Sequence, residues 1–156
     1  MTLPIENVQS YPRPPALEPV PQRLTIRFGK QVIADTVAAL RVLETHHAPT
    51  YYLPPSDITA TLTRASNGSF CEWKGQARYW TVTAGDAVAN AAAWSYPDPS
   101  PRFAELKDHV AFYAGQMDAC YVGDVLVTPQ PGDFYGGWVT PNLQGQIKGA
   151  PGTRHW

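Results

Sequence analysis

The sequence predicts a mainly β protein built from antiparallel strands, with two or three short helices. Its 16 prolines and 12 glycines supply many turn residues. Five Trp, eight Tyr and five Phe add large side chains that favour strands. Strand-length runs bounded by Gly and Pro recur from Leu24 to Thr140. A length of 156 residues favours one domain with a core of its own.

Composition divides the chain into three parts. Residues 1–23 form a proline-rich N-terminal arm, because repeated proline favours an extended chain outside a sheet interior. Residues 24–140 form the single β domain. Residues 141–156 form a C-terminal tail broken by Gly and Pro, which Trp156 could anchor.

The first half of the domain predicts a hairpin followed by further strands. Residues 24–28 and 31–34 form the hairpin, because the Gly-Lys pair between them suits a two-residue turn. Residues 36–44 fit either a short helix or a strand, since their apolar positions satisfy both periods in part. Residues 50–53 are rich in β-forming side chains and predict a strand that ends at two prolines.

The rest of the domain predicts two helical segments among strands. Ser56 is a natural N-cap, and Ile58, Leu62 and Ala65 lie on one face of a helix of about nine residues. A second, shorter helical turn starts at Pro101. The remaining strands are expected at Ser69–Trp73, Arg78–Thr83, Val88–Tyr96, His109–Tyr113, Cys120–Val122 and Asp124–Val127.

Charge and hydropathy exclude several classes of function. There are 12 Lys and Arg against 13 Asp and Glu, and without a basic block we expect no nucleic-acid partner. The most apolar stretch, Val88–Trp94, is too short to cross a bilayer, so we expect no membrane association. The N-terminus lacks the pattern of a secretory signal. Cys71 and Cys120 are far apart and are expected to be free thiols in a cytoplasmic protein.

The common catalytic and metal-binding motifs are absent from the sequence. It contains no glycine-rich phosphate loop, no zinc-protease motif and no nucleophile elbow. His46 and His47 are adjacent, so on an extended chain they point to opposite faces and do not easily share one ion. We expect them to be solvent-exposed loop histidines, and we expect no metal and no other cofactor.

Three segments concentrate side chains that are common in binding sites. They are Cys71–Trp80, Trp94–Pro97 and His109–Tyr113. In an extended chain alternate residues share a face, which puts Trp94 beside Tyr96. The same alternation separates Val110 and Phe112, which we expect in the core, from Tyr113. A purely structural interpretation stays open for each segment, because strand aromatics usually fill a core and a free Cys is usually inert.

Five motifs in this order resemble the family called domain of unknown function 427. The similarity covers roughly Leu24 to Thr140. The motifs are Ala39-Leu40-Arg41-Val42-Leu43-Glu44, Tyr51-Tyr52-Leu53-Pro54 with Asp57, Cys71-Glu72-Trp73-Lys74-Gly75 with Tyr79-Trp80, Trp94-Ser95-Tyr96-Pro97 and His109-Val110-Ala111-Phe112-Tyr113.

The resemblance implies a fold akin to the β-tent of Mss4-like proteins and methionine sulfoxide reductase B. In that fold two antiparallel sheets meet at an angle and leave a ligand-sized opening between them. Many β-tent proteins hold zinc with two CxxC pairs. This sequence has neither pair, so we expect the zinc site to be missing.

The family is also labelled nucleotidyltransferase-like. Such transferases typically hold Mg²⁺ with two carboxylates one residue apart. The sequence has no Asp-x-Asp and no Glu-x-Glu, so the residues give that label no chemical support.

Our first hypothesis for function is a small-molecule-binding domain with an aromatic-lined pocket, with an anionic ligand as one expectation. The binding residues would be Arg41, Lys74, Tyr79, Trp94, Tyr96 and Tyr113. We expect Arg41, Cys71, Lys74, Trp94, Tyr96 and His109 to converge on one cavity.

Two alternatives stay open at this point. In an enzyme, His109 would act as general acid or base and Cys71 as nucleophile. In a protein-interaction module, the proline-rich arm would be the docking element. We expect a monomer or a small homo-oligomer.

Overall fold

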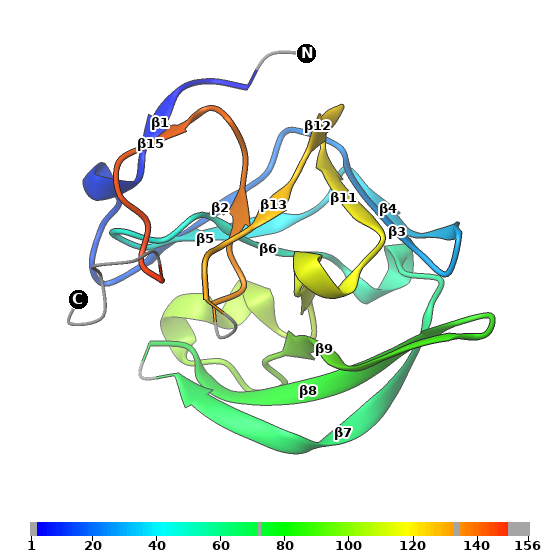
Figure 1. Cartoon of the computed structure of the whole chain (residues 1–156). Helices are drawn as coiled ribbons and strands as arrows, with labels where there is room; N and C mark the ends of the chain where they lie inside the picture. Colours follow the sequence, from blue (N-terminus) through cyan, green and yellow to red (C-terminus); the bar gives the residue numbers. More distant parts are fainter. Residues whose placement is uncertain (1–2, 72, 133–134, 150–156) are drawn as a thin grey trace.

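The structure, a computed structural model, describes residues 3–71, 73–132 and 135–149. In these residues it contains two four-stranded antiparallel sheets, a three-stranded antiparallel sheet and two two-stranded pairs (Figure 1). The helices are short 3-10 segments: Val8–Ser10 (η1), Pro55–Asp57 (η2), Pro101–Leu106 (η3) and Ala114–Gln116 (η4). The prediction of a mainly β fold is confirmed.

The first four-stranded sheet has the order β12-β11-β3-β4. Its strands are Leu24–Phe28 (β3), Gln31–Thr36 (β4), Ala119–Val122 (β11) and Val125–Leu126 (β12). The predicted hairpin is present, and both turn residues, Gly29 and Lys30, have a positive φ of 63°. A turn of this kind matches the right-handed twist of the strands that it joins.

The second four-stranded sheet has the order β10-β9-β8-β7 and forms the floor of the molecule in the view of Figure 1. Its strands are Thr61–Cys71 (β7), Gly75–Ala84 (β8), Ala87–Ser95 (β9) and Val110–Phe112 (β10). The strands β7 and β8 form a long hairpin whose turn contains Trp73 and Lys74.

The helix predicted from Ser56 is wrong. Its helical part is a single turn, η2, after which the chain joins the edge of β4. Thr59 donates its backbone N–H to the carbonyl of Ile33 at 2.7 Å. Pairing with a distant strand therefore overrides the local helical spacing of the apolar residues.

The three-stranded sheet has the order β2-β5-β6. Its strands are Ala16–Pro19 (β2), Leu40–Leu43 (β5) and Thr50–Tyr52 (β6). For residues 36–44 the sequence left helix and strand open, and Leu40–Leu43 in this stretch is a strand. β2 comes from the proline-rich arm and lies at the sheet edge, where a proline without an N–H is tolerated. A bridge between Leu53 and Val110 joins β6 to β10.

The first and the last strand of the described chain lie side by side (Figure 1). Glu6–Asn7 (β1) pairs in parallel with Leu143–Gln144 (β15). The remaining pair is Thr128–Pro129 (β13) with Trp138–Val139 (β14). Trp156, considered above as an anchor, lies outside the described residues.

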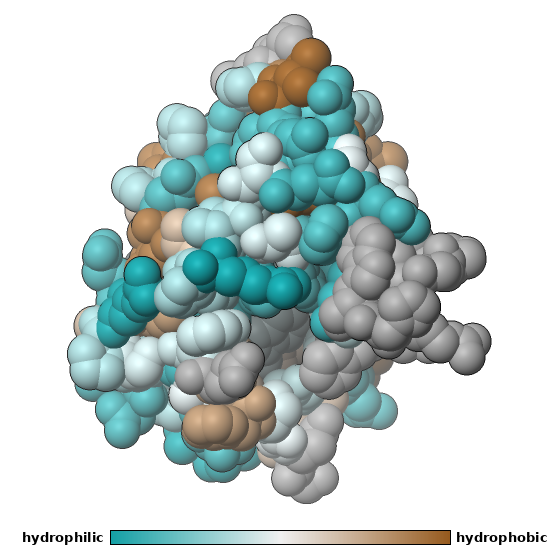
Figure 2. Space-filling view, turned by 90° about the vertical axis from the view of Figure 1, so that its left-hand side faces the viewer, coloured by the Kyte–Doolittle hydropathy of each residue, from teal (hydrophilic) through white to brown (hydrophobic). Residues whose placement is uncertain are grey.

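The described apolar side chains form one large cluster, a second, more aromatic one, and a small third one around Val8. Neighbouring residues on β10 alternate between the first two, because successive strand residues point to opposite faces. Val110 and Phe112 belong to the large cluster, whereas Ala111 and Tyr113 belong to the second. On the face seen in Figure 2, hydrophobic residues form small separate patches. Among the described residues, no helix has the length and apolar character needed to cross a membrane.

Candidate functional site

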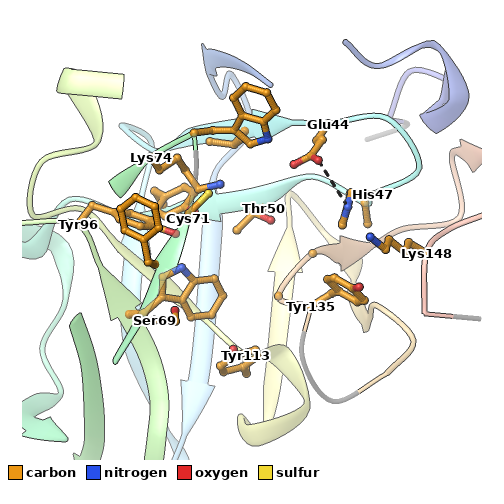
Figure 3. A pocket seen from close by; sticks show the side chains of 18 of the residues that line it. Glu44, His47, Thr50, Ser69, Cys71, Lys74, Tyr96, Tyr113, Tyr135 and Lys148 are labelled. Carbon is orange, nitrogen blue, oxygen red and sulfur yellow. Dashed lines mark ion pairs between the residues drawn. The ribbon is translucent and has the colours of Figure 1, made fainter. Parts of the chain in front are cut away.

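A pocket of about 290 Å³ lies over the second apolar cluster (Figure 3). The β7–β8 hairpin, β9, the loop after β5 and the segment 135–148 all contribute to its lining. The predicted site residues that line it are Cys71, Lys74, Tyr79, Trp94, Tyr96 and Tyr113.

The wall of the pocket is aromatic and is centred on Trp94. The ring of Tyr113 lies 4.6 Å from that of Trp94, and the ring of Tyr79 lies 6.4 Å away. Tyr52 meets Trp94 edge-on at 6.5 Å. Rings at these separations and tilts attract one another. The indole is therefore held in place by the rings around it.

Strand register explains how these rings come together. Tyr79 on β8 lies directly opposite Trp94 on β9, and Ala111 on β10 lies opposite Trp94 on the other side. Directly opposite residues on one face of a sheet are in contact. Trp94 therefore has a large partner on one neighbouring strand and a small one on the other.

The chain closes over Trp94 at Gly136. A Cβ placed on Gly136 would lie 2.0 Å from Cη2 of Trp94, well inside contact distance. Only a residue without a side chain lets the backbone approach the indole this closely. The backbone at Gly136 therefore bounds the pocket beside Trp94.

The tyrosine hydroxyls give the pocket neutral polar groups. Burial raises the pKa of Tyr52 and of Tyr96 above the ordinary value. Burial, followed by a hydrogen bond with Tyr79, also raises the pKa of Tyr113. The hydroxyl of Tyr79 lies 3.1 Å from Oγ of Ser69. The hydroxyls of Tyr52, Tyr96 and Tyr113 therefore stay protonated at neutral pH and can donate or accept hydrogen bonds.

Two lysines bring positive charge to the pocket from different sides. Lys74 Nζ lies 5.8 Å from the ring centre of Tyr96, and Lys148 Nζ lies 5.5 Å from that of Tyr135. Figure 3 shows Lys74 on one side of the pocket and Lys148 on the other. Both distances are within the range of cation–π attraction. Lys148 and Tyr135 were not among the predicted site residues.

His47 is the histidine of this pocket. Its side chain is 17% exposed, and Nε2 lies 3.9 Å from Oε2 of Glu44. Its Nδ1 lies 3.2 Å from Nε2 of the buried Gln130. Burial and then the charge of Lys148 lower the pKa of His47 to about 4. The ring is therefore neutral at physiological pH.

The expectation that both adjacent histidines are solvent-exposed is wrong for His47. His46 has a positive φ of 65°, and its Nδ1 approaches the carbonyl of Gln146 at 3.3 Å. This turn sends the two rings to different partners. In the described part of the chain, no group of three or more His, Cys, Asp or Glu residues could hold a metal ion.

Arg41 and His109, both predicted to converge on the cavity, do not line it. Arg41 is held by carboxylates of the N-terminal arm: Nε donates to Glu18 at 2.7 Å, and Nη2 donates to Glu6 at 3.0 Å. His109 lies in the turn before β10, where its Nδ1 is 3.2 Å from the carbonyl of Lys107. The side chains of Arg41 and His109 therefore make their polar contacts outside the pocket.

The two cysteines are free thiols with different surroundings. Cys71 is partly exposed at the pocket. Cys120 is buried in the large cluster, and burial raises its pKa to about 12. Of the two thiols, Cys71 is the one that a ligand could reach.

A family model described as a domain of unknown function (DUF427) matches residues 16–123. No curated protein matches the chain. The matched region contains the aromatic wall, and it ends before Gln130, Gly136 and Lys148.

Proposed function

This chain belongs to the DUF427 family, whose description names no activity, and from the pocket itself we propose that it reversibly binds a small aromatic anion. The observation that carries this proposal is an aromatic wall around Trp94 with a lysine on either side of it.

Size and shape support a ligand of one or two rings. The cavity of about 290 Å³ lies at the lower end of the range for small-molecule sites. An aromatic ligand packed against Trp94 and Tyr113 would add a ring contact worth about 0.5–1.5 kcal/mol beyond its buried area. Because the rings already pack on one another, little ordering is needed on binding.

The charges of the lining favour an anion. Lys74 and Lys148 are positive, Glu44 is the one described carboxylate of the lining, and His47 is neutral. The described lining therefore has a positive balance. In a partly enclosed site this attraction is stronger than in open water.

Binding is better supported than acid–base catalysis. The sequence suggested His109 as the acid or base, but His109 is not part of the lining. His47 is a poor general base, because its Nδ1 lies against an amide of Gln130 and its pKa is far below neutrality. Cys71 lines the pocket without an activating histidine at hydrogen-bond distance among the described residues.

Calorimetric titration with three matched probes tests the proposal. Benzoate is aromatic and anionic, cyclohexanecarboxylate is anionic only, and benzyl alcohol is aromatic only. We expect benzoate to bind best. Lys74→Met and Lys148→Met should each weaken benzoate binding about threefold to tenfold. The control is Lys107→Met, which removes an exposed lysine outside the pocket.

Two results would contradict the proposed function. One is equal binding of the three probes, which would mean that neither rings nor charge are recognised. The other is an equal loss of benzoate affinity in Lys107→Met, which would mean that only the overall charge of the protein matters.

A further inference from the structure

The orientation of the Gln130 side-chain amide is fixed by the backbone around it. Gln130 is 2% exposed, and its Oε1 accepts the N–H of Ala48 at 3.2 Å. Its Nε2 donates to the carbonyl of Lys148 at 2.9 Å. A backbone N–H can only donate and a carbonyl can only accept, so the two ends of the amide cannot be exchanged.

This orientation decides where the proton of His47 lies. Nε2 of Gln130 is a donor and lies 3.2 Å from Nδ1 of His47, so Nδ1 must accept. In a neutral imidazole the proton is then on Nε2. Glu44 Oε2 is 3.9 Å from Nε2, which favours a proton there but is too far for a hydrogen bond.

The charged groups around His47 come from several elements. Glu44 precedes it on the same loop, and Lys148, Arg13, Lys74 and His46 oppose its protonation. Imidazolium would also turn Nδ1–H toward the donor of Gln130, which costs a hydrogen bond. Geometry and charge both keep the ring neutral.

We propose that Gln130 is a specificity-determining residue: it holds His47 as a neutral Nε2–H donor, so that the pocket selects aromatic carboxylates over amines of the same skeleton. This inference rests on the proposed binding function. The donor joins Lys74 and Lys148 in favouring an acceptor, and it keeps that role throughout the physiological pH range. If the proton were on Nδ1 instead, Nε2 would present a lone pair and would repel a carboxylate at the same place.

The first test examines the tautomer without any ligand. In nitrogen-15 spectra of histidine-labelled protein at about pH 7, His47 should show a protonated Nε2 and an unprotonated Nδ1. In Gln130→Glu, a carboxylate replaces the donor, and the proton should move to Nδ1. A protonated Nδ1 in the unaltered protein, or no change in Gln130→Glu, would overturn the proposal.

The second test measures selectivity with benzoate and benzylamine. Affinity is measured on histidine variants, because Glu at position 130 would add a negative charge near the pocket. The amide of His47→Gln can place an N–H near the position of Nε2, whereas His47→Asn places it near Nδ1. We expect benzoate to bind about tenfold more tightly to His47→Gln than to His47→Asn, while benzylamine binds weakly to all forms.

The two tests separate this inference from the proposed function. Equal benzoate affinity in His47→Gln and His47→Asn would show that Gln130 does not determine selectivity through His47, even if the tautomer of His47 is as expected. Absence of benzoate binding to the unaltered protein would refute the binding function and the selectivity together, while the spectra still decide whether Gln130 sets the tautomer.

Discussion

Replacing Gly136 by Ala should disturb the pocket wall and the stability of the fold together. The new Cβ would lie 2.0 Å from Cη2 and 2.8 Å from Cζ2 of Trp94. The indole cannot easily retreat, because Trp94 is 7% exposed and Tyr113 packs on it at 4.6 Å. Overpacking of this kind costs about 1–3 kcal/mol. At this chain length, that corresponds to a melting temperature lower by about 2–12 °C.

The assay is thermal unfolding, followed by circular dichroism in the aromatic region, together with benzoate titration. Gly115→Ala is the matched control, because a Cβ there would lie 3.6 Å from Cγ of Pro129, an ordinary contact. The control should change stability by no more than about 0.5 kcal/mol. If Gly136→Ala melts like the control and binds benzoate equally, the close approach to Trp94 is not a constraint and the reasoning is refuted.

Two further predictions concern charge. Arg41→Met should lower the free energy of unfolding in urea by about 1–3 kcal/mol, because it leaves half-buried Glu6 with the hydroxyl of Tyr11 but without its positively charged partner. Arg23→Met, which breaks an exposed pair, should change little. A similar loss in both variants would contradict this. The lowered pKa of His47 means that the unfolded chain takes up a proton before the folded one, so stability should fall as pH drops from about 6.5 to about 4. In His47→Gln this step should be absent, and identical pH profiles would show that His47 is not buried as a neutral ring.

The aromatic part of the site could be predicted because it depends on local periodicity. Trp94 and Tyr96 are two residues apart on an extended chain, and both line the pocket. Tyr113 is separated by the same alternation from Val110 and Phe112, which lie in the large cluster. Any sequence that forms strands at these positions places the rings on common faces, whatever the rest of the chain does.

Apart from Cys71 and Lys74, the polar part of the site could not be predicted, because it depends on pairs that are distant in the sequence. Gln130 lies 83 residues after His47, and no spacing rule connects them. Arg41 was assigned to the pocket, but its partner Glu6 lies 35 residues earlier in the proline-rich arm. The only local signal for His47 was its place shortly before Tyr51 and Tyr52, and the doubled histidine was interpreted as a pair of solvent-exposed loop residues.

The sequence separation between His47 and Gln130 also has a consequence for biosynthesis. The aromatic wall is complete in the nascent chain once Tyr113 has been added, but Gln130 and Lys148 emerge only later. At about 5–20 residues per second, translation leaves this wall without its outer cover for about two to seven seconds. During that interval the half-built pocket presents the rings around Trp94 without the residues that later lie beside them.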